Sequence, residues 1–214
     1  MTKKVLILTG DFVDDYELMV PYSILKMFGC EIKVICPGKE KGDFIKTALH
    51  YISVEDWQLA LKGKPVTYSE SLGHPYRLTD DFNWNDVENE VLSYDGLIIP
   101  GGRAPEYLSL LPDVQKLVGY FMKVNKPIGA ICHGAQILAH SDAAFESLKY
   151  LEGKKMYPYP SVSLACSLQG ARIEDQYSPD ITFTDGNLVT SPSWLALPDF
   201  MYNFLKLLNL KTLP

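Results

Sequence analysis

Short apolar runs alternate along the chain with longer segments whose apolar residues recur at helical spacing. Val5 to Leu8 is continuously apolar and rich in branched residues, which is typical of a strand buried on both faces of a parallel sheet. Residues 14–28 carry apolar side chains at helical spacing and are followed by Gly29, a common helix stop. The same reasoning predicts strands at 31–36, 97–99 and 127–131, and helices at 114–124, from 133 to 139 and at 198–208. This alternation predicts an α/β fold in which helices cover both faces of an open, mainly parallel sheet.

Three regions interrupt the alternation. Residues 39–85 contain several turn signals and predict a short helix near 54–61 with one or two short strands. Residues 141–154 predict a helical insertion that ends at Gly153. Residues 172–190 predict short strands that turn at the Asp-Gly-Asn sequence 185–187, a hairpin signal. The sequence contains no repeat, low-complexity tract or linker, so we expect a single domain over 1–214.

Composition and charge limit the classes of protein to which the chain can belong. Hydrophobic residues make up 47% of the 214 residues and charged residues 21%, a globular composition with enough apolar material for a sizeable core. Lys and Arg number 20 and Asp and Glu 26, a formal charge of −6 without a basic stripe, so nucleic acid is not an expected partner. No apolar run approaches the roughly 20 residues of a membrane span. The apolar part of the N-terminal segment ends at Gly10, too soon for a signal peptide, so we expect a cytoplasmic protein.

The cysteines and histidines do not form a recognisable metal site. There are four of each, and the cysteines contain no Cys-x-x-Cys pair and no zinc-type spacing with histidine. Four cysteines in a chain of this length are too few for a disulfide scaffold. We therefore expect free thiols and neither a metal nor another cofactor. The sequence context of Cys30, Cys36 and Cys166 favours packing positions for these three thiols.

Cys132 lies in a different context, the sequence Ala130-Ile131-Cys132-His133-Gly134. An apolar strand leads directly into the cysteine and a helical pattern begins immediately, which is typical of a nucleophile elbow with cysteine in place of serine. Such an elbow presents the thiol at the carboxyl end of the sheet, beside the positive end of a helix dipole that lowers the thiol pKa. The backbone N–H of His133 is then a candidate oxyanion donor. A buried structural cysteine is the alternative interpretation, and the elbow pattern favours a functional thiol.

Two further segments carry candidate chemistry. Gly101 and Gly102 follow a strand and bring backbone N–H groups close to a ligand, although a Gly-Gly pair is also an ordinary turn. Glu17 lies in an otherwise apolar stretch, where burial would raise its pKa and let it hold a proton near the thiol. The neighbouring Asp14 and Asp15 are explained as ordinary partners of a helix N-terminus. His74 lies in a turn sequence, where a surface position is more common than a position in a pocket.

Together these motifs resemble the ThiJ/PfpI superfamily. The similarity rests on Ala-Ile-Cys-His-Gly at 130–134, Pro-Gly-Gly-Arg-Ala-Pro-Glu at 100–106 and Asp-Asp-Tyr-Glu at 14–17. It extends through Tyr-Pro-Tyr-Pro at 157–160 and covers nearly the whole chain. Thr-Tyr-Ser-Glu at 67–70, Gly-His at 73–74 and the sequence 183–190 are similar to one half of the plant tandem-domain members. The chain is longer than the compact family pattern near 50–64 and 141–150.

The resemblance implies a fold, a set of site residues and an assembly. The implied fold is a flavodoxin-like three-layer sandwich of the class I glutamine amidotransferase type. Cys132 would be the nucleophile, hydrogen-bonded to Glu17, with His133 as acid or base and Gly102 and the His133 amide as the oxyanion site. In PfpI-like oligomers the glutamate that matches Glu106 orients a histidine of the neighbouring subunit. We therefore expect a homo-oligomer, a dimer or higher.

Three functions fit these residues. In the favoured one, a glutathione-independent glyoxalase, Cys132 adds to an aldehyde such as methylglyoxal, and Glu17 or His133 moves a proton between the two substrate carbons. In the second, Cys132, His133 and Glu106 form the triad of a PfpI-type intracellular peptidase or amidase that acts on peptides. In the third, the Cys132 thiol is oxidised in a non-enzymatic redox-sensing stress protein. The preference for the glyoxalase rests on the family resemblance.

Overall fold

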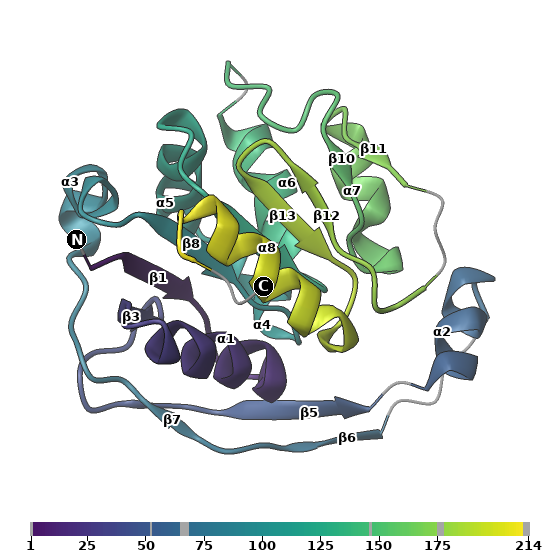
Figure 1. Cartoon of the computed structure of the whole chain (residues 1–214), viewed down its shortest axis with the longest axis horizontal. Helices are drawn as coiled ribbons and strands as arrows, with labels where there is room; N and C mark the ends of the chain where they lie inside the picture. Colours follow the sequence, from purple (N-terminus) through teal and green to yellow (C-terminus); the bar gives the residue numbers. More distant parts are fainter. Residues whose placement is uncertain (1, 52, 65–68, 146, 175–177, 212–214) are drawn as a thin grey trace.

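The computed structural model describes residues 2–51, 53–64, 69–145, 147–174 and 178–211. Within these ranges a six-stranded sheet has the strand order β12-β13-β9-β8-β1-β3 (Figure 1). Five of its strands are parallel: β1 (Lys4–Leu8), β3 (Glu31–Ile35), β8 (Gly96–Ile99), β9 (Ile128–Ile131) and β13 (Leu188–Ser191). The edge strand β12 (Phe183–Asp185) pairs antiparallel with β13 through the predicted 185–187 turn. The predicted α/β fold with a mainly parallel sheet is confirmed.

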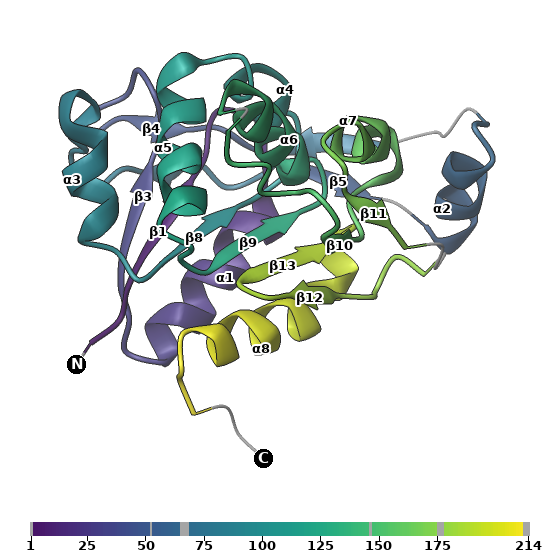
Figure 2. The ribbon, with the colours of Figure 1, turned by 90° about the horizontal axis from the view of Figure 1, so that it is seen from above.

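Helices cover both faces of this sheet (Figure 2). One face carries α1 (Asp15–Met27) and α8 (Leu197–Leu207). The other carries α3 (Val87–Leu92), α4 (Ala104–Leu108), α5 (Pro112–Lys123), α6 (Gly134–Ala144) and α7 (Ser163–Leu168). Every residue of β8 and β9 is buried, because these strands lie in the middle of the sheet and are covered on both sides. Their continuous apolar sequences therefore reflect a two-sided core.

The region 39–85 contains more strands than the sequence predicts. The helix near 54–61 is confirmed as α2 (Val54–Leu61). Instead of one or two strands, the described part contains β4 (Phe44–Ile45), β5 (Thr47–Tyr51), β6 (Ser69–Leu72) and β7 (Tyr76–Arg77). A second sheet joins β5 and β6 to β2 (Val13–Asp14), and β4 pairs with β7. Segments of two to five residues are too short to establish a recognisable alternation. Residues 67 and 68 of the Thr-Tyr-Ser-Glu motif lie outside the described residues.

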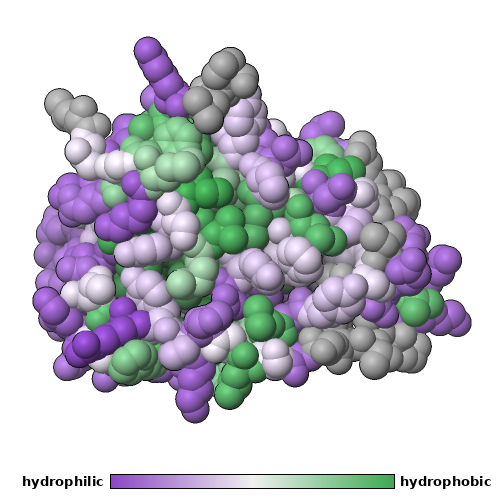
Figure 3. Space-filling model, turned by 60° about the horizontal axis from the view of Figure 1, so that its bottom comes forward, coloured by the Kyte–Doolittle hydropathy of each residue, from purple (hydrophilic) through white to green (hydrophobic). Residues whose placement is uncertain are grey.

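The side of the molecule that carries β5, β6 and β7 is shown in Figure 3. Hydrophobic and hydrophilic surface alternate over this face. Exposed apolar side chains of the short strands of this region include Phe44 of β4, Tyr51 of β5 and Leu72 of β6. In the described ranges, no helix is long and apolar enough to cross a membrane.

The predicted helical insertion over 141–154 is wrong. Helix α6 continues to Ala144, and the described residues from 147 to 153 then form turns. The buried Asp142 carboxylate accepts the backbone N–H groups of Tyr150 at 2.8 Å and Leu151 at 2.9 Å. These bonds replace the helical partners that the two N–H groups would otherwise need. Beyond the turns lie β10 (Lys155–Met156) and β11 (Arg172–Ile173), and short 3-10 helices occupy Trp84–Asp86, Pro160–Val162 and Trp194–Ala196.

Candidate active site

Cys132 occupies a sharp turn between β9 and α6. Its φ is +55°, the left-handed region that non-glycine residues seldom adopt. The strain is tolerated because the Cys132 N–H donates to the Ser191 carbonyl of the neighbouring strand at 2.8 Å. Helix α6 begins two residues later at Gly134, where a β-carbon would collide with the Ile99 carbonyl. The thiol therefore lies at the carboxyl end of the sheet, at the N-terminus of α6.

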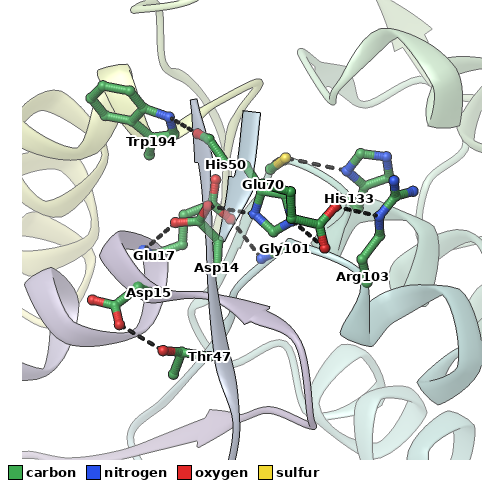
Figure 4. Close-up of polar contacts among 11 residues, drawn as sticks. Asp14, Asp15, Glu17, Thr47, His50, Glu70, Gly101, Arg103, His133 and Trp194 are labelled. Atoms are coloured by element: carbon green, nitrogen blue, oxygen red, sulfur yellow. Dashed lines mark hydrogen bonds and ion pairs between the residues drawn. The ribbon is translucent and has the colours of Figure 1, made fainter. Parts of the chain in front are cut away.

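Glu17 lies beside the thiol and is almost completely buried. It comes from the first turn of α1, and its carboxylate oxygen Oε2 accepts the Gly101 N–H at 2.7 Å (Figure 4). It also shares a hydrogen bond with Cys132. Burial, and next the negative charge of Asp14, raise the pKa of Glu17 well above its usual value. Gly101 is required here, because a β-carbon on it would lie 2.6 Å from Cys132 Cβ and 2.7 Å from Glu17 Oε2.

The sequence predicts a lowered pKa for the Cys132 thiol, but in the structure this pKa is raised. Burial raises this pKa well above its usual value, and the charges of Glu17 and Asp14 raise it further. The backbone N–H groups of His133 and Gly102 hydrogen-bond to the sulfur and act in the opposite direction. They are the two groups that the resemblance assigns to the oxyanion site. The proton of the Cys132–Glu17 pair is thus held tightly, and the N–H groups are the contacts that favour a thiolate.

His133 covers the other side of the sulfur. Its Nδ1 lies 3.3 Å from Cys132 Sγ, its Nε2 lies 3.2 Å from the Ser161 hydroxyl, and its ring stacks on Tyr159 at 4.5 Å. Burial lowers the pKa of His133 to about 4, although the charge of Glu106 acts to raise it. The imidazole is therefore neutral near pH 7. One of its nitrogens faces the thiol and the other faces a hydroxyl.

Glu106 lies at the edge of this arrangement. Its side chain is about half exposed and accepts a hydrogen bond from Arg103 Nη1 at 2.8 Å within the same chain. Its predicted role on a histidine of another subunit stays a prediction.

All of the predicted site residues except Gly101 line one cavity of about 410 Å³, together with several that sequence reasoning did not select. Glu17, Gly102, Glu106, Cys132 and His133 are in its wall. The additional lining residues are Asp14, His50, Arg103, Gln136, Tyr159, Ser161, Val162, Ala165, Ser193 and Trp194.

The most informative of the missed residues are Asp14 and His50. Asp14 is 2% exposed, and its Oδ2 lies 2.9 Å from His50 Nδ1, which comes from β5 (Figure 4). The sequence explains Asp14 only as a helix-dipole partner, and the three-dimensional pairing reveals its place in the site. His74 is 87% exposed and is not among the residues that line the cavity. No group of three or more His, Cys, Asp or Glu side chains in the described ranges is arranged to hold a metal ion.

Comparisons with known proteins give the chain a family and a set of relatives. Residues 3–207 match the family model of the DJ-1/PfpI family. The chain is 40% identical to the protein DJ-1 homolog D of Arabidopsis thaliana over 98% of this chain and 48% of that protein. It is 28% identical to a deglycase of Pyrococcus horikoshii, over 96% of this chain and 99% of that protein. The structure of Schizosaccharomyces pombe DJ-1 superimposes with a TM-score of 0.67 at 24% identity, over 95% of this chain and 90% of that one. The chain thus spans about half the length of the plant relative.

Proposed function

Because the chain belongs to the DJ-1/PfpI family, we propose that it is a glutathione-independent glyoxalase that converts methylglyoxal-type 2-oxoaldehydes to 2-hydroxy acids. Relatives that are named deglycases support an enzyme acting on a small molecule. One observation carries the proposal. The Cys132 thiol lies in a cavity wall and is hydrogen-bonded to the buried Glu17 carboxyl group. The N–H groups of Gly102 and His133 also hydrogen-bond to its sulfur.

The first step of the proposed reaction is addition of the thiol to the aldehyde. The Cys132 sulfur forms a bond to the aldehyde carbon, and the proton held by the Cys132–Glu17 pair passes to the carbonyl oxygen. The product is a hemithioacetal. As the bond forms, negative charge grows on the oxygen, and the Gly102 and His133 N–H groups are placed to stabilise it.

The second step moves a hydrogen from one substrate carbon to the other. Glu17 or His133 removes the proton from the carbon bound to sulfur and returns a proton to the adjacent carbon, which gives a 2-hydroxy thioester. Water then hydrolyses the thioester, which releases the 2-hydroxy acid and restores the thiol. The sum is one 2-oxoaldehyde and one water converted to one 2-hydroxy acid, without an external oxidant or reductant.

The peptidase and redox-sensor interpretations use the same thiol. A peptidase requires a carboxylate that orients His133. In the described chain the His133 Nε2 contacts the Ser161 hydroxyl instead, so a carboxylate would have to come from another subunit. The buried Glu17 beside the thiol, whose pKa is raised, offers a second proton-transfer group that the proposed glyoxalase reaction uses and the peptidase triad does not.

The test is lactate formation from methylglyoxal without glutathione, measured beside a Cys132→Ala variant. We expect lactate from the wild type and at least about a hundredfold less from the variant, because the covalent step is lost. If neither protein makes lactate, the proposal is wrong. Cleavage of peptide substrates would then support the peptidase, and peroxide oxidation confined to Cys132, seen by mass spectrometry, would support the sensor.

A further inference from the structure

His50 is a cavity histidine to which the proposed reaction gives no role. It lies on β5, in the second sheet formed with β2 and β6. Its side chain is 18% exposed, and its Nδ1 is 2.9 Å from Asp14 Oδ2. Its backbone carbonyl accepts the Trp194 Nε1–H at 3.1 Å, which fixes this part of β5 beside the cavity. The imidazole is therefore held in one orientation against a buried carboxylate.

Asp14 links this histidine to the reactive pair. Its second carboxylate oxygen, Oδ1, accepts the Glu17 N–H at 3.2 Å, and its own N–H donates to the Gly101 carbonyl at 3.3 Å. Glu17 in turn contacts the Gly101 N–H and the Cys132 thiol. Hydrogen bonds thus link His50 to Asp14, Asp14 to the Glu17 backbone, and the Glu17 side chain to Gly101 and to Cys132. Figure 4 shows the first three of these links.

We propose that His50 is a positioning residue for the reactive thiol, because its hydrogen bond to the Asp14 carboxylate sets how readily the Cys132–Glu17 pair releases its proton. This effect is on the thiol itself, so it does not depend on which reaction the thiol carries out. His50 acts through Asp14 and is not assigned a contact with substrate.

Electrostatics gives the direction of the effect. The negative charge of Asp14 raises the pKa of both Glu17 and Cys132, because a second negative charge nearby is unfavourable in a buried site. A hydrogen bond from His50 compensates part of that charge. Without it, Asp14 Oδ2 loses its partner in an apolar environment and repels a thiolate more strongly.

Other charged groups also surround His50. Glu70 Oε1 lies 3.8 Å from its Nε2, and Arg103 Nε lies 3.8 Å from Glu70 Oε2. Among the described residues, Nε2 has no hydrogen-bond partner. His133 lies close enough for its pKa to respond to the charge of His50, and it also responds to Glu106. Asp14 is the carboxylate within hydrogen-bond distance of the His50 ring, whereas Glu70 lies farther away and also contacts Arg103, so Asp14 is the group through which His50 acts on the thiol.

The experiment measures the rate of Cys132 alkylation by iodoacetamide as a function of pH, with the labelled peptide identified by mass spectrometry. We expect the midpoint of this profile to rise by about one pH unit in His50→Ala. Asp14→Asn keeps a capping oxygen for α1 but removes the charge, so its midpoint should fall below that of the wild type. In the Asp14→Asn background, His50→Ala should cause no further shift.

His50→Asn and His74→Ala complete the design. The asparagine variant keeps a side-chain N–H for Asp14, so its shift should be smaller than that of alanine, and it replaces His50→Ala if the latter does not fold. His74 is 87% exposed, and its removal should leave the profile unchanged.

Two results would overturn the proposed role of His50. One is that the His50 variants have the same pH midpoint of Cys132 alkylation as the wild type. The other is a shift caused by His50→Ala that is equally large in the wild-type and Asp14→Asn backgrounds, because His50 would then not act through the Asp14 charge. The first result counts against the role of His50 whether or not the variant still forms lactate, and the glyoxalase proposal stands on its own test.

Discussion

At the scale of the residue, burial decides the charge of the site. Glu17, Cys132 and His133 all have a pKa shifted toward the neutral form, and in each case burial is the largest cause. Because Glu17, Cys132 and His133 are all neutral and lie close together, protons can move among them and the substrate without any of these three side chains being held charged in the buried site beforehand. This arrangement suits an uncharged aldehyde substrate better than an anion.

The depressed pKa of His133 has a consequence for stability. Its pKa falls from 6.5 to about 4 on folding, so between these values the unfolded chain binds a proton that the folded chain resists. The stability present above pH 6.5 is therefore lost as the pH falls toward 4. Between about pH 7 and about pH 5, we expect the free energy of unfolding of the wild type to drop by about 1–2 kcal/mol more than that of His133→Gln. Urea unfolding at the two pH values measures the difference, and parallel losses in both proteins would contradict it.

Residues in the site differ in how far sequence could identify them. Cys132, His133 and Gly102 were accessible because a strand, a turn and a helix start leave a local signature. The Asp14–His50 pair joins residues 36 positions apart on elements that contain only a few residues each. No local pattern encodes such a contact, so only the folded chain shows it.

At the scale of the element, α2 connects the additional region 39–85 to the site. Trp57 of α2 is fully buried and packs edge-on against Tyr159 with ring centroids 5.7 Å apart. Tyr159 in turn stacks on His133. The helix near 54–61 therefore reaches the cavity wall through two aromatic contacts, while β5 of the same region contributes His50 to the wall directly.

We expect Trp57→Ala to lower stability by about 3–5 kcal/mol, because it leaves a large cavity beside Tyr159. The loosened Tyr159 should also lower lactate formation by about tenfold at saturating methylglyoxal, since His133 loses its fixed orientation. Trp57→Phe keeps an aromatic contact and serves as the control, with an intermediate loss of stability. Unfolding curves and initial rates measure the two effects, and an unchanged rate in Trp57→Ala would show that α2 is only structural support.

The buried strands of the central sheet and the long helices that cover it were predictable, whereas the short strands of 39–85 and the turns after α6 were not. The buried runs of β1, β8 and β9 and the periodic helices α1, α5 and α8 carry patterns long enough to define them. The helix expected over 141–154 failed because a single side chain, Asp142, holds the backbone in a turn through two hydrogen bonds. Such a bond depends on tertiary position, which apolar periodicity does not record.

At the scale of the whole molecule, Glu106 tests whether the site is completed by a second subunit. If Glu106 acts on His133 of a neighbouring chain, Cys132→Ala and Glu106→Gln should each be inactive alone but recover activity when mixed. Random pairing in a dimer predicts recovery of roughly a quarter of the wild-type sites. Lactate formation after unfolding and refolding the mixed proteins measures this. Each variant refolded alone is the control. If the mixture is no more active than its components, Glu106 acts within its own chain.

The walls of the cavity come from widely separated parts of the chain. The Glu17–Gly101 hydrogen bond spans 84 positions, and the bond from Trp194 to His50 spans 144. Closing such long loops costs entropy before any contact forms, so we expect this site to be among the last features to assemble during folding. Recovery of enzymatic turnover after dilution from denaturant should therefore report completion of the entire topology.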